Sequence, residues 1–238
     1  MKKQIPNFLT CMNLFSGCIA AVMIFRNRLD MTAYFILAAG FFDLLDGMVA
    51  RKVGSDPHFG KQMDSLADVV SFGFVPGAVM FKLLQMSDLS SIIGNESVRS
   101  VIQFFPFVIT IFSAIRLAKF NLDTRQTNSF IGLPTPANTL MIISFPLILI
   151  QHPGQFDGII LNPIFNFAIC AFMSFMLVAE IPLFALKFKN FKFKENSFQY
   201  IMILSIVILG AIFSFAAIPM LVILYVLLSF LKNNYQTK

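Results

Sequence analysis

Charged side chains are scarce in this sequence. Only 13% of its 238 residues are charged, whereas 57% are hydrophobic, and the mean hydropathy is +0.78. A soluble globular domain carries roughly twice this share of charge, about 25%, so the composition excludes a soluble protein. The apolar residues fall in repeated runs of about 20, the length with which a helix crosses a hydrocarbon core of roughly 30 Å. We therefore predict an integral membrane protein.

Other features that the sequence lacks narrow the architecture. It shows no ten-residue alternation of the kind that builds a membrane β-barrel, and backbone in lipid must satisfy its own hydrogen bonds. We therefore predict an all-α, polytopic helical bundle. No internal repeat or long soluble linker is evident, so residues 1–238 are expected to form a single domain. The three cysteines, Cys11, Cys18 and Cys170, lack metal-ligand spacing and are interpreted as small core residues.

The apolar runs predict about eight transmembrane helices. These are residues 8–25, 32–51, 62–86, 98–120, 135–151, 159–186, 199–215 and 217–232. The first run continues past Cys18, so we expect an uncleaved span rather than a signal peptide. Pro219 marks the expected turn between the last two helices, although these two runs are also compatible with one long kinked helix.

The basic residues predict the orientation in the membrane. With eight spans both termini lie on one side, and 14 of the 18 Lys and Arg residues fall there. Only Arg26, Arg28 and Arg99 lie opposite, and Lys82 lies inside the third span. The positive-inside rule then places both termini at the cytoplasmic face of the cytoplasmic membrane. The net charge of +6 needs no nucleic acid partner, and the Lys/Phe stretch at 183–196 is expected to lie at anionic headgroups without forming a specific site.

Four aspartates stand out in this apolar chain. Asp43 and Asp46 are three residues apart at the end of the second predicted span, and Asp64 and Asp68 are four apart at the start of the third. Each spacing puts both carboxylates on one helical face. Because only residues 52–60 connect the two helices, the helices should be antiparallel neighbours. The four carboxylates are therefore expected to converge near the cytoplasmic end of the bundle.

Converging carboxylates indicate a divalent cation site. Their mutual repulsion and lost hydration need a compensating positive charge. Apart from His58 no His or Cys lies nearby in the sequence, so oxygen ligation favours Mg²⁺ or Mn²⁺, which keep positions open for phosphate. Gly47 and Ala50 leave one helical turn nearly bare, and Arg51 offers a forked phosphate donor. We therefore expect a phosphate-bearing substrate.

The same residues carry a family resemblance. Residues 43–68 fit the pattern D-x2-D-G-x2-A-R-x8-G-x3-D-x3-D, which resembles the signature of the CDP-alcohol phosphatidyltransferase family. The resemblance implies a membrane enzyme that displaces CMP from a CDP-linked lipid with an alcohol. It further implies specific roles: two divalent metals held by Asp43, Asp46 and Asp64 with Asp68 in reach, CDP bound by Gly47, Ala50 and Arg51, and Asp68 as the general base.

The start of the first helix fits the same resemblance. Pro6, Asn7 and Thr10 resemble the P-N-x-x-T entry of these enzymes, which implies that Asn7 and Thr10 help to bind CDP. The alternative is that both are ordinary capping residues. The chain departs from some relatives at Pro57, where they carry a hydroxyl residue; Ser55 or a backbone group is the alternative contact there.

Three later stretches bear on the acceptor alcohol. Residues 64–77 (DSLADVVSFGFVPG), 116–121 (RLAKFN) and 132–137 (GLPTPA) resemble the phosphatidylserine synthase branch of the family. The expected reaction is transfer of the phosphatidyl group of CDP-diacylglycerol to L-serine. The candidates for the acceptor site are Ser71, Arg116, Lys119 and Arg125. The three basic residues are alternatively positive-inside anchors, and Ser71 alternatively bonds a helix carbonyl.

Two other functions remain open. Glycerol 3-phosphate or inositol phosphate would also need arginines, so the basic residues do not discriminate among acceptors. Outside the enzyme class, intramembrane carboxylates are typical of ion-coupled transporters; the gathering of the aspartates at one membrane face, without paired repeats, argues against this. A homodimer is plausible for the family, although no sequence feature demonstrates it.

Overall fold

The computed structural model describes residues 4–53, 57–123, 129–184 and 196–236. Helices make up most of these residues, as the sequence predicted. The α-helices are α1 (Ile5–Phe25), α2 (Leu29–Val53), α3 (Pro57–Asp68), α4 (Val75–Met86), α5 (Glu96–Ile102), α6 (Val108–Leu122), α7 (Thr135–Gln151), α8 (Asp157–Ile160), α9 (Pro163–Val178), α10 (Ser197–Phe213) and α11 (Ala217–Gln236). A π-helix, η2 (Val69–Phe74), joins α3 to α4, and short 3₁₀ turns are η3 (Leu89–Ser91), η4 (Phe105–Phe107) and η5 (Ser214–Ala216).

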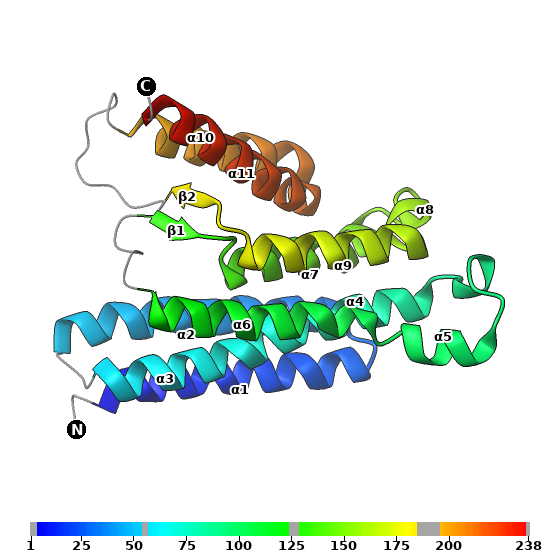
Figure 1. Ribbon diagram of the computed structural model, residues 1–238, viewed down its shortest axis with the longest axis horizontal. Helices are drawn as coiled ribbons and strands as arrows, with labels where there is room; N and C mark the ends of the chain where they lie inside the picture. The colour runs from blue at the N-terminus through cyan, green and yellow to red at the C-terminus, as the bar shows by residue number, and fades with distance from the viewer. Residues whose placement is uncertain (1–3, 54–56, 124–128, 185–195, 237–238) are drawn as a thin grey trace.

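The helices stack in three layers (Figure 1). The first layer holds α1 to α4 and α6, with α1 and α2 packed as an antiparallel pair. Above it lie α7, which contacts α2, α4 and η2, and α9, which contacts α6. The α10 and α11 pair forms the third layer, where α11 contacts α7. The middle layer is therefore covered on both sides.

Local sequence signals explain how the middle layer is held. Asn162 caps α9, because its Oδ1 accepts hydrogen bonds from the backbone N–H groups of Ile164 (2.9 Å) and Phe165 (3.3 Å). Gly132 adopts a positive φ of 77°, and a Cβ there would lie 2.6 Å from the Leu177 carbonyl oxygen. Only glycine fits this turn. It ties the chain entering α7 to the end of α9.

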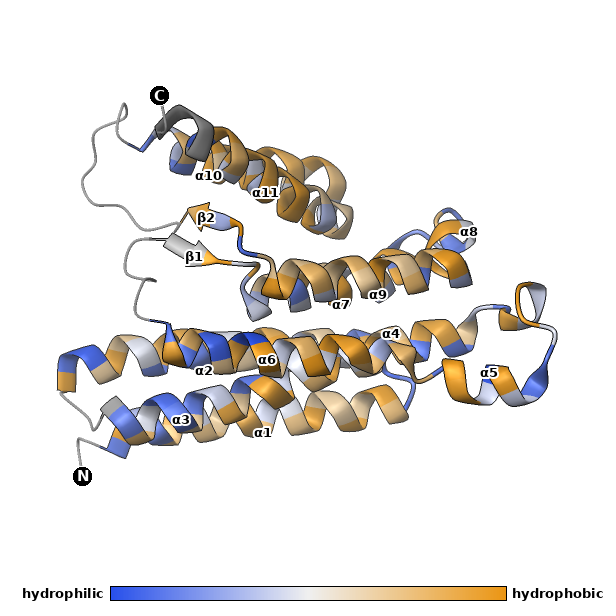
Figure 2. Ribbon diagram, in the orientation of Figure 1, coloured by the Kyte–Doolittle hydropathy of each residue, from blue (hydrophilic) through white to orange (hydrophobic). Residues whose placement is uncertain are grey.

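The helices have the length and composition of membrane spans. Five stretches qualify: Ile5–Phe25, Leu29–Val53, His58–Met86, Glu96–Leu122 and Ser197–Lys232; Thr135–Gln151 and Pro163–Val178 are shorter apolar helices. Figure 2 shows apolar ribbon along most of their length and polar residues gathered towards their ends. The structure is that of a multi-pass helical membrane protein. The predicted count of eight spans stays a prediction.

The predicted sixth span is wrong at its end. Residues 159–186 were expected to be helical throughout, but α9 ends at Val178 and β2 (Pro182–Phe184) follows. β2 pairs antiparallel with β1 (Ser129–Ile131), and Ile131 lies opposite Pro182. Pro182 disfavours helical backbone at the preceding residue, Ile181, so the helix is expected to end at or before that residue. A two-stranded ladder is thus added to the all-α bundle.

Two other sequence interpretations need correction. The turn expected at Pro219 lies earlier, at η5, where Ser214 has a φ of 49°. Pro219 lies in the first turn of α11, where its missing N–H is not needed. The two helices pack against each other as a hairpin, not as one kinked helix. Cys170 is buried as expected, but Cys11 and Cys18 are exposed, so the core interpretation is wrong for these two.

Candidate active site

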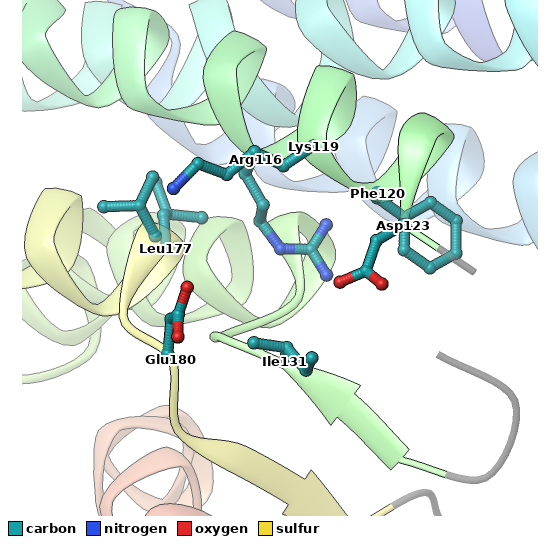
Figure 3. A pocket seen from close by; sticks show the side chains of 8 residues that line it. Arg116, Lys119, Phe120, Asp123, Ile131, Leu177 and Glu180 are labelled. Carbon is teal, nitrogen blue, oxygen red and sulfur yellow. The ribbon is translucent and has the colours of Figure 1, made fainter. Parts of the chain in front are cut away.

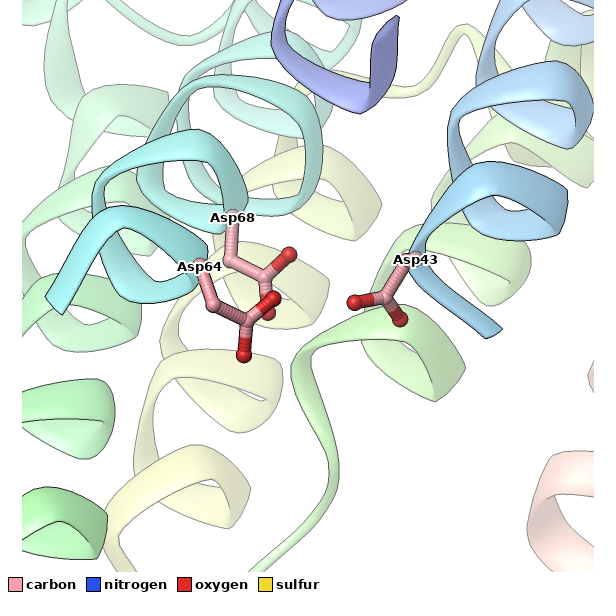
Figure 4. A group of neighbouring side chains, drawn as sticks. All are labelled: Asp43, Asp64 and Asp68. Atoms are coloured by element: carbon pink, nitrogen blue, oxygen red, sulfur yellow. The ribbon is translucent and has the colours of Figure 1, made fainter. Parts of the chain in front are cut away.

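Three of the four aspartates form one cluster. Asp43 on α2 and Asp64 and Asp68 on α3 each place a carboxylate oxygen within 4.8 Å of the other two. Figure 4 shows Asp64 and Asp68 side by side on one helix and pointing across to Asp43 on the other. Asp68 is buried, at 7% exposed, whereas Asp43 and Asp64 are half-buried. The helical spacing therefore brings these carboxylates together as predicted.

Asp46 is buried one turn further along α2 and is not part of this cluster of three. Its Oδ2 accepts a 2.6 Å hydrogen bond from the Thr10 hydroxyl on α1. Thr10 is itself 4% exposed, so the contact is shielded from water. Thr10 therefore binds an aspartate of the signature directly. The sequence analysis had considered only a contact with CDP or a helix cap for this residue.

Asn13 is one of the candidate site residues that the sequence analysis missed. It is completely buried on α1, and its Nδ2 donates a 3.1 Å hydrogen bond to Asp68 Oδ1. The bond fixes the Asp68 carboxylate and leaves Oδ2 for other partners. A signal was present in the sequence, because Asn13 follows Thr10 by three residues and so shares its helical face.

The π-helix η2 begins directly after Asp68 and is fitted closely to α1. Ser71 is fully buried there and donates a 3.1 Å hydrogen bond to the Asn13 backbone oxygen. A Cβ added at Gly17 would collide with the Ser71 side chain, so only glycine permits this approach. The Ser71 hydroxyl thus bonds a carbonyl of a neighbouring helix, and its proposed contact with the acceptor stays a prediction.

The cluster has the chemistry of a hard-cation site. Its donors are carboxylate oxygens, which Mg²⁺ and Mn²⁺ prefer. Asp64 Oδ1 is buried and has no hydrogen-bond partner among the described residues. Among the described residues, no Lys or Arg forms an ion pair with these three carboxylates. The residues present therefore fit a divalent metal.

The candidate CDP contacts surround an open part of the same site. Gly47 is exposed, and a Cβ there would meet nothing within 4 Å, as expected for a bare helical turn. Ala50 is half-buried and Arg51 is exposed at the end of α2. Asn7 on α1 faces the start of α3, since its Oδ1 would lie 3.9 Å from a Cβ on Gly60. These positions leave room for a substrate beside the aspartates.

Arg116 connects the aspartates to a small pocket. It is 7% exposed, its Nε has no hydrogen-bond partner among the described residues, and it interacts electrostatically with Asp68. Its guanidinium carbon lies 5.9 Å from the centre of the Phe120 ring. Lys119 is exposed on the same helix and also lines the pocket. The third basic candidate, Arg125, lies outside the described residues.

The pocket carries both signs of charge. Its volume is about 40 Å³, and Asp123 and Glu180 line it together with Arg116 and Lys119 (Figure 3). In Figure 3 the Asp123 carboxylate and the Arg116 guanidinium point toward one another. The sequence analysis missed both acidic residues; the signal for Glu180 was a lone acid inside the predicted sixth span. A cavity needs about 10–15 Å³ of such space to hold one water molecule, so this pocket has room for small polar groups.

A family model described as CDP-alcohol phosphatidyltransferase matches residues 3–186. The chain belongs to the CDP-alcohol phosphatidyltransferase family. The aspartate cluster and the exposed turn of α2 at Gly47 lie within the matched residues. Thr10, Asn13 and Arg116 lie within them as well. The α10 and α11 hairpin lies beyond them.

Named relatives in this family are similar over different shares of the chain. An archaetidylserine synthase from Methanothermobacter thermautotrophicus is 34% identical over 146 residues, 60% of this chain and 58% of that protein. A CDP-diacylglycerol–serine O-phosphatidyltransferase from Helicobacter pylori strain J99 is 32% identical over 140 residues, 58% of this chain and 55% of that protein. The Bacillus subtilis protein of the same name is 26% identical over 197 residues, 79% of this chain and 91% of that protein. The chain thus spans little more than half of the first two relatives and most of the third.

Proposed function

We propose that the protein transfers the phosphatidyl group of CDP-diacylglycerol to the hydroxyl of L-serine and releases CMP. The observation that carries the proposal is the cluster of Asp43, Asp64 and Asp68, whose carboxylate oxygens lie within 4.8 Å of one another inside a family signature. The names of the relatives support serine as the acceptor.

The aspartates hold the metal in this proposal. Asp43, Asp46 and Asp64 would hold two divalent ions, Mg²⁺ or Mn²⁺, with Asp68 in reach. When bound, the ions neutralise the diphosphate and stabilise the departing CMP. Asn7, Thr10, Gly47, Ala50 and Arg51 bind and orient the CDP group, and the open turn of α2 admits it.

Asp68 is the general base. Asn13 occupies Asp68 Oδ1, so Oδ2 takes the proton of the serine hydroxyl. The serine oxygen forms a bond to the phosphorus that carries diacylglycerol, and the bond from that phosphorus to the oxygen bridging to CMP breaks. CMP leaves with the bridging oxygen. Burial of Asp68 excludes water, which would otherwise compete with serine as the nucleophile.

The positive and negative side chains around the pocket at Arg116 favour serine over the other candidate acceptors. Serine is a zwitterion, so Arg116 and Lys119 suit its carboxylate while Asp123 and Glu180 suit its ammonium group. Glycerol 3-phosphate and inositol phosphate have no cation, and two carboxylates in the pocket would repel their phosphates. The electrostatic interaction of Arg116 with Asp68 supports an acceptor site beside the proposed base.

The acceptor is tested by supplying purified protein with CDP-diacylglycerol, Mn²⁺ or Mg²⁺, and each labelled alcohol in turn. The expected result is labelled phosphatidylserine and stoichiometric CMP with serine alone. If glycerol 3-phosphate reacts and serine does not, the serine assignment is wrong. If no alcohol reacts but an ion crosses vesicles that contain the protein, the enzyme assignment itself fails in favour of a transporter.

We propose further that the chain works as one membrane domain, with both termini and the active site at the cytoplasmic face of the cytoplasmic membrane. The contacts of α11 with α7 and β2 support one domain. The basic residues support the orientation. Reporter fusions at each terminus test it, and opposite readings from the two ends would contradict it. A homodimer stays a prediction of the family resemblance.

A further inference from the structure

A second recess lies at the end of the bundle away from the aspartates. It has a volume of about 370 Å³ and lies between the end of α1, the second half of α4 and the segment around η4. Most of its lining is apolar, including Ile24, Phe25, Phe81 and Phe104. Lys82 contributes the one cation of this lining. We call this recess the Lys82 groove.

Stacked aromatic rings make the wall of the groove rigid. The Phe81 ring centre lies 5.4 Å from that of Phe104 and 5.6 Å from that of Phe107. Phe107 in turn stacks on Phe74, with ring centres 5.8 Å apart. Such offset rings resist rearrangement, because each aromatic pair adds about 0.5–1.5 kcal/mol beyond the burial of its area. The groove is therefore formed without a ligand.

Lys82 is an unusual residue at this depth. It is half-buried on α4, four residues before that helix ends at Met86, inside a stretch with the length and composition of a membrane span. An ammonium group in such a span needs an anion or access to the interface. No carboxylate of the described residues forms an ion pair with Lys82.

Two of the acidic groups near this end, Asp88 and Asp30, have partners of their own. The Asp88 carboxylate, just beyond α4, accepts a 3.0 Å hydrogen bond from the Ser90 backbone N–H within its own turn. Asp30 is held by Arg28, whose Nε lies 3.0 Å from Asp30 Oδ1. Arg26 follows Phe25 at the groove and is exposed, which adds positive charge. The groove therefore combines an apolar floor with one ammonium group, and no carboxylate is among its lining residues.

We propose that the Lys82 groove binds an anionic phospholipid from the leaflet opposite the aspartate cluster. Lys82 contacts the lipid phosphate, and the apolar lining receives an acyl chain. Lys82 follows Asp68 by 14 residues, or roughly 20 Å of helix at 1.5 Å per residue, which separates the two sites by much of a hydrocarbon core of roughly 30 Å. This site is independent of the proposed reaction.

Charge complementarity selects this occupant. A water-soluble phosphate would match Lys82 but not the apolar lining, and an uncharged lipid would match the lining but not Lys82. A zwitterionic phospholipid brings its own cation, which opposes Lys82 and Arg26. An anionic phospholipid satisfies both parts of the groove, and a basic residue at a membrane surface contributes about 1 kcal/mol to such binding.

Native mass spectrometry of the purified full chain tests the proposal. Phosphatidylglycerol and phosphatidylcholine with identical acyl chains are titrated against the parent protein, Lys82→Gln and Lys82→Arg. We expect the parent protein to prefer phosphatidylglycerol, Lys82→Gln to bind it about fivefold more weakly, and Lys82→Arg to retain the preference. Arg99→Gln, which removes a cation at the same end but outside the groove lining, is the matched control and should change nothing.

Three outcomes would overturn the proposal. The first is equal binding of both lipids by the parent protein, which would mean that Lys82 merely reaches the headgroup layer. The second is equal loss in Lys82→Gln and Arg99→Gln, which would indicate a diffuse charge effect. The third is displacement of the lipid by millimolar inorganic phosphate, which would identify a site for the headgroup alone. The Lys82→Arg variant also replaces the side chain but keeps the charge. Retained lipid preference in this variant would show that the loss in Lys82→Gln comes from the missing charge and not from misfolding.

Discussion

Replacing Asn13 with leucine tests how the first helix serves the active site. The change keeps the size of the side chain but removes the 3.1 Å hydrogen bond from Nδ2 to Asp68 Oδ1. A hydrogen bond to a charged group contributes about 1.5–3 kcal/mol, and each 1.4 kcal/mol of barrier is about tenfold in rate. We therefore expect kcat to fall by about 10- to 100-fold, while KM for CDP-diacylglycerol stays within about twofold, because Asn13 contacts Asp68, the proposed base, and none of the proposed CDP contacts.

The assay is steady-state release of CMP at saturating serine, with thermal unfolding measured in the same detergent. Ser16→Ala is the matched control, because Ser16 is buried one turn further along α1 and donates to none of the described aspartates. It should keep its full rate. A folded Asn13→Leu protein with the parent kcat would refute the positioning role, and an equal loss in Ser16→Ala would show that any change on this face is harmful.

Three other changes test separate parts of the structure. Asp43→Asn removes one carboxylate of the cluster and should raise the Mn²⁺ concentration needed for half-maximal activity at least about tenfold; an unchanged metal dependence would contradict the site. Arg116→Lys keeps the charge but loses the two parallel N–H donors of the guanidinium group, so KM for serine should rise about tenfold while KM for CDP-diacylglycerol changes little. A rise in KM for CDP-diacylglycerol instead would assign Arg116 to the donor site. Gly17→Ala forces a methyl group against Ser71 and should lower the free energy of unfolding by about 1–3 kcal/mol, which a lower unfolding temperature would reveal. The control Gly210→Ala faces open space on α10 and should be neutral or slightly stabilising.

Features that depend on helical periodicity could be predicted from the sequence. The fifth predicted span, residues 135–151, coincides with α7, because Pro136 and a continuous apolar run define this helix locally. The meeting of Asp43 with Asp64 and Asp68 follows from spacings of three and four residues and a short connection. Both inferences use information contained within a few turns of helix.

Features that depend on tertiary contacts were missed. The π-helix after Asp68 has no local sequence signal; it is accompanied by the close approach of Ser71 to Gly17 on another helix. The end of α9 at Val178 depends partly on β2 pairing with a strand about 50 residues earlier. Glu180 lies between α9 and β2 and lines the same pocket as Arg116, which belongs to a helix about 60 residues earlier, so its place in the pocket could not be read from either segment alone.

The first helix explains why composition misled the interpretation of single residues. Its inward face is polar or small at Thr10, Asn13, Ser16 and Gly17, while Phe8 and Phe15 are 64% and 58% exposed. This is the reverse of a soluble helix, because the outer face of a membrane helix meets lipid and polar groups must find partners inside the bundle. Cys11 and Cys18 are exposed for the same reason that Asn13 is buried. α1 therefore supplies no carboxylate, yet it holds one oxygen each of Asp46 and Asp68, and the geometry of the active site depends on the packing of this helix.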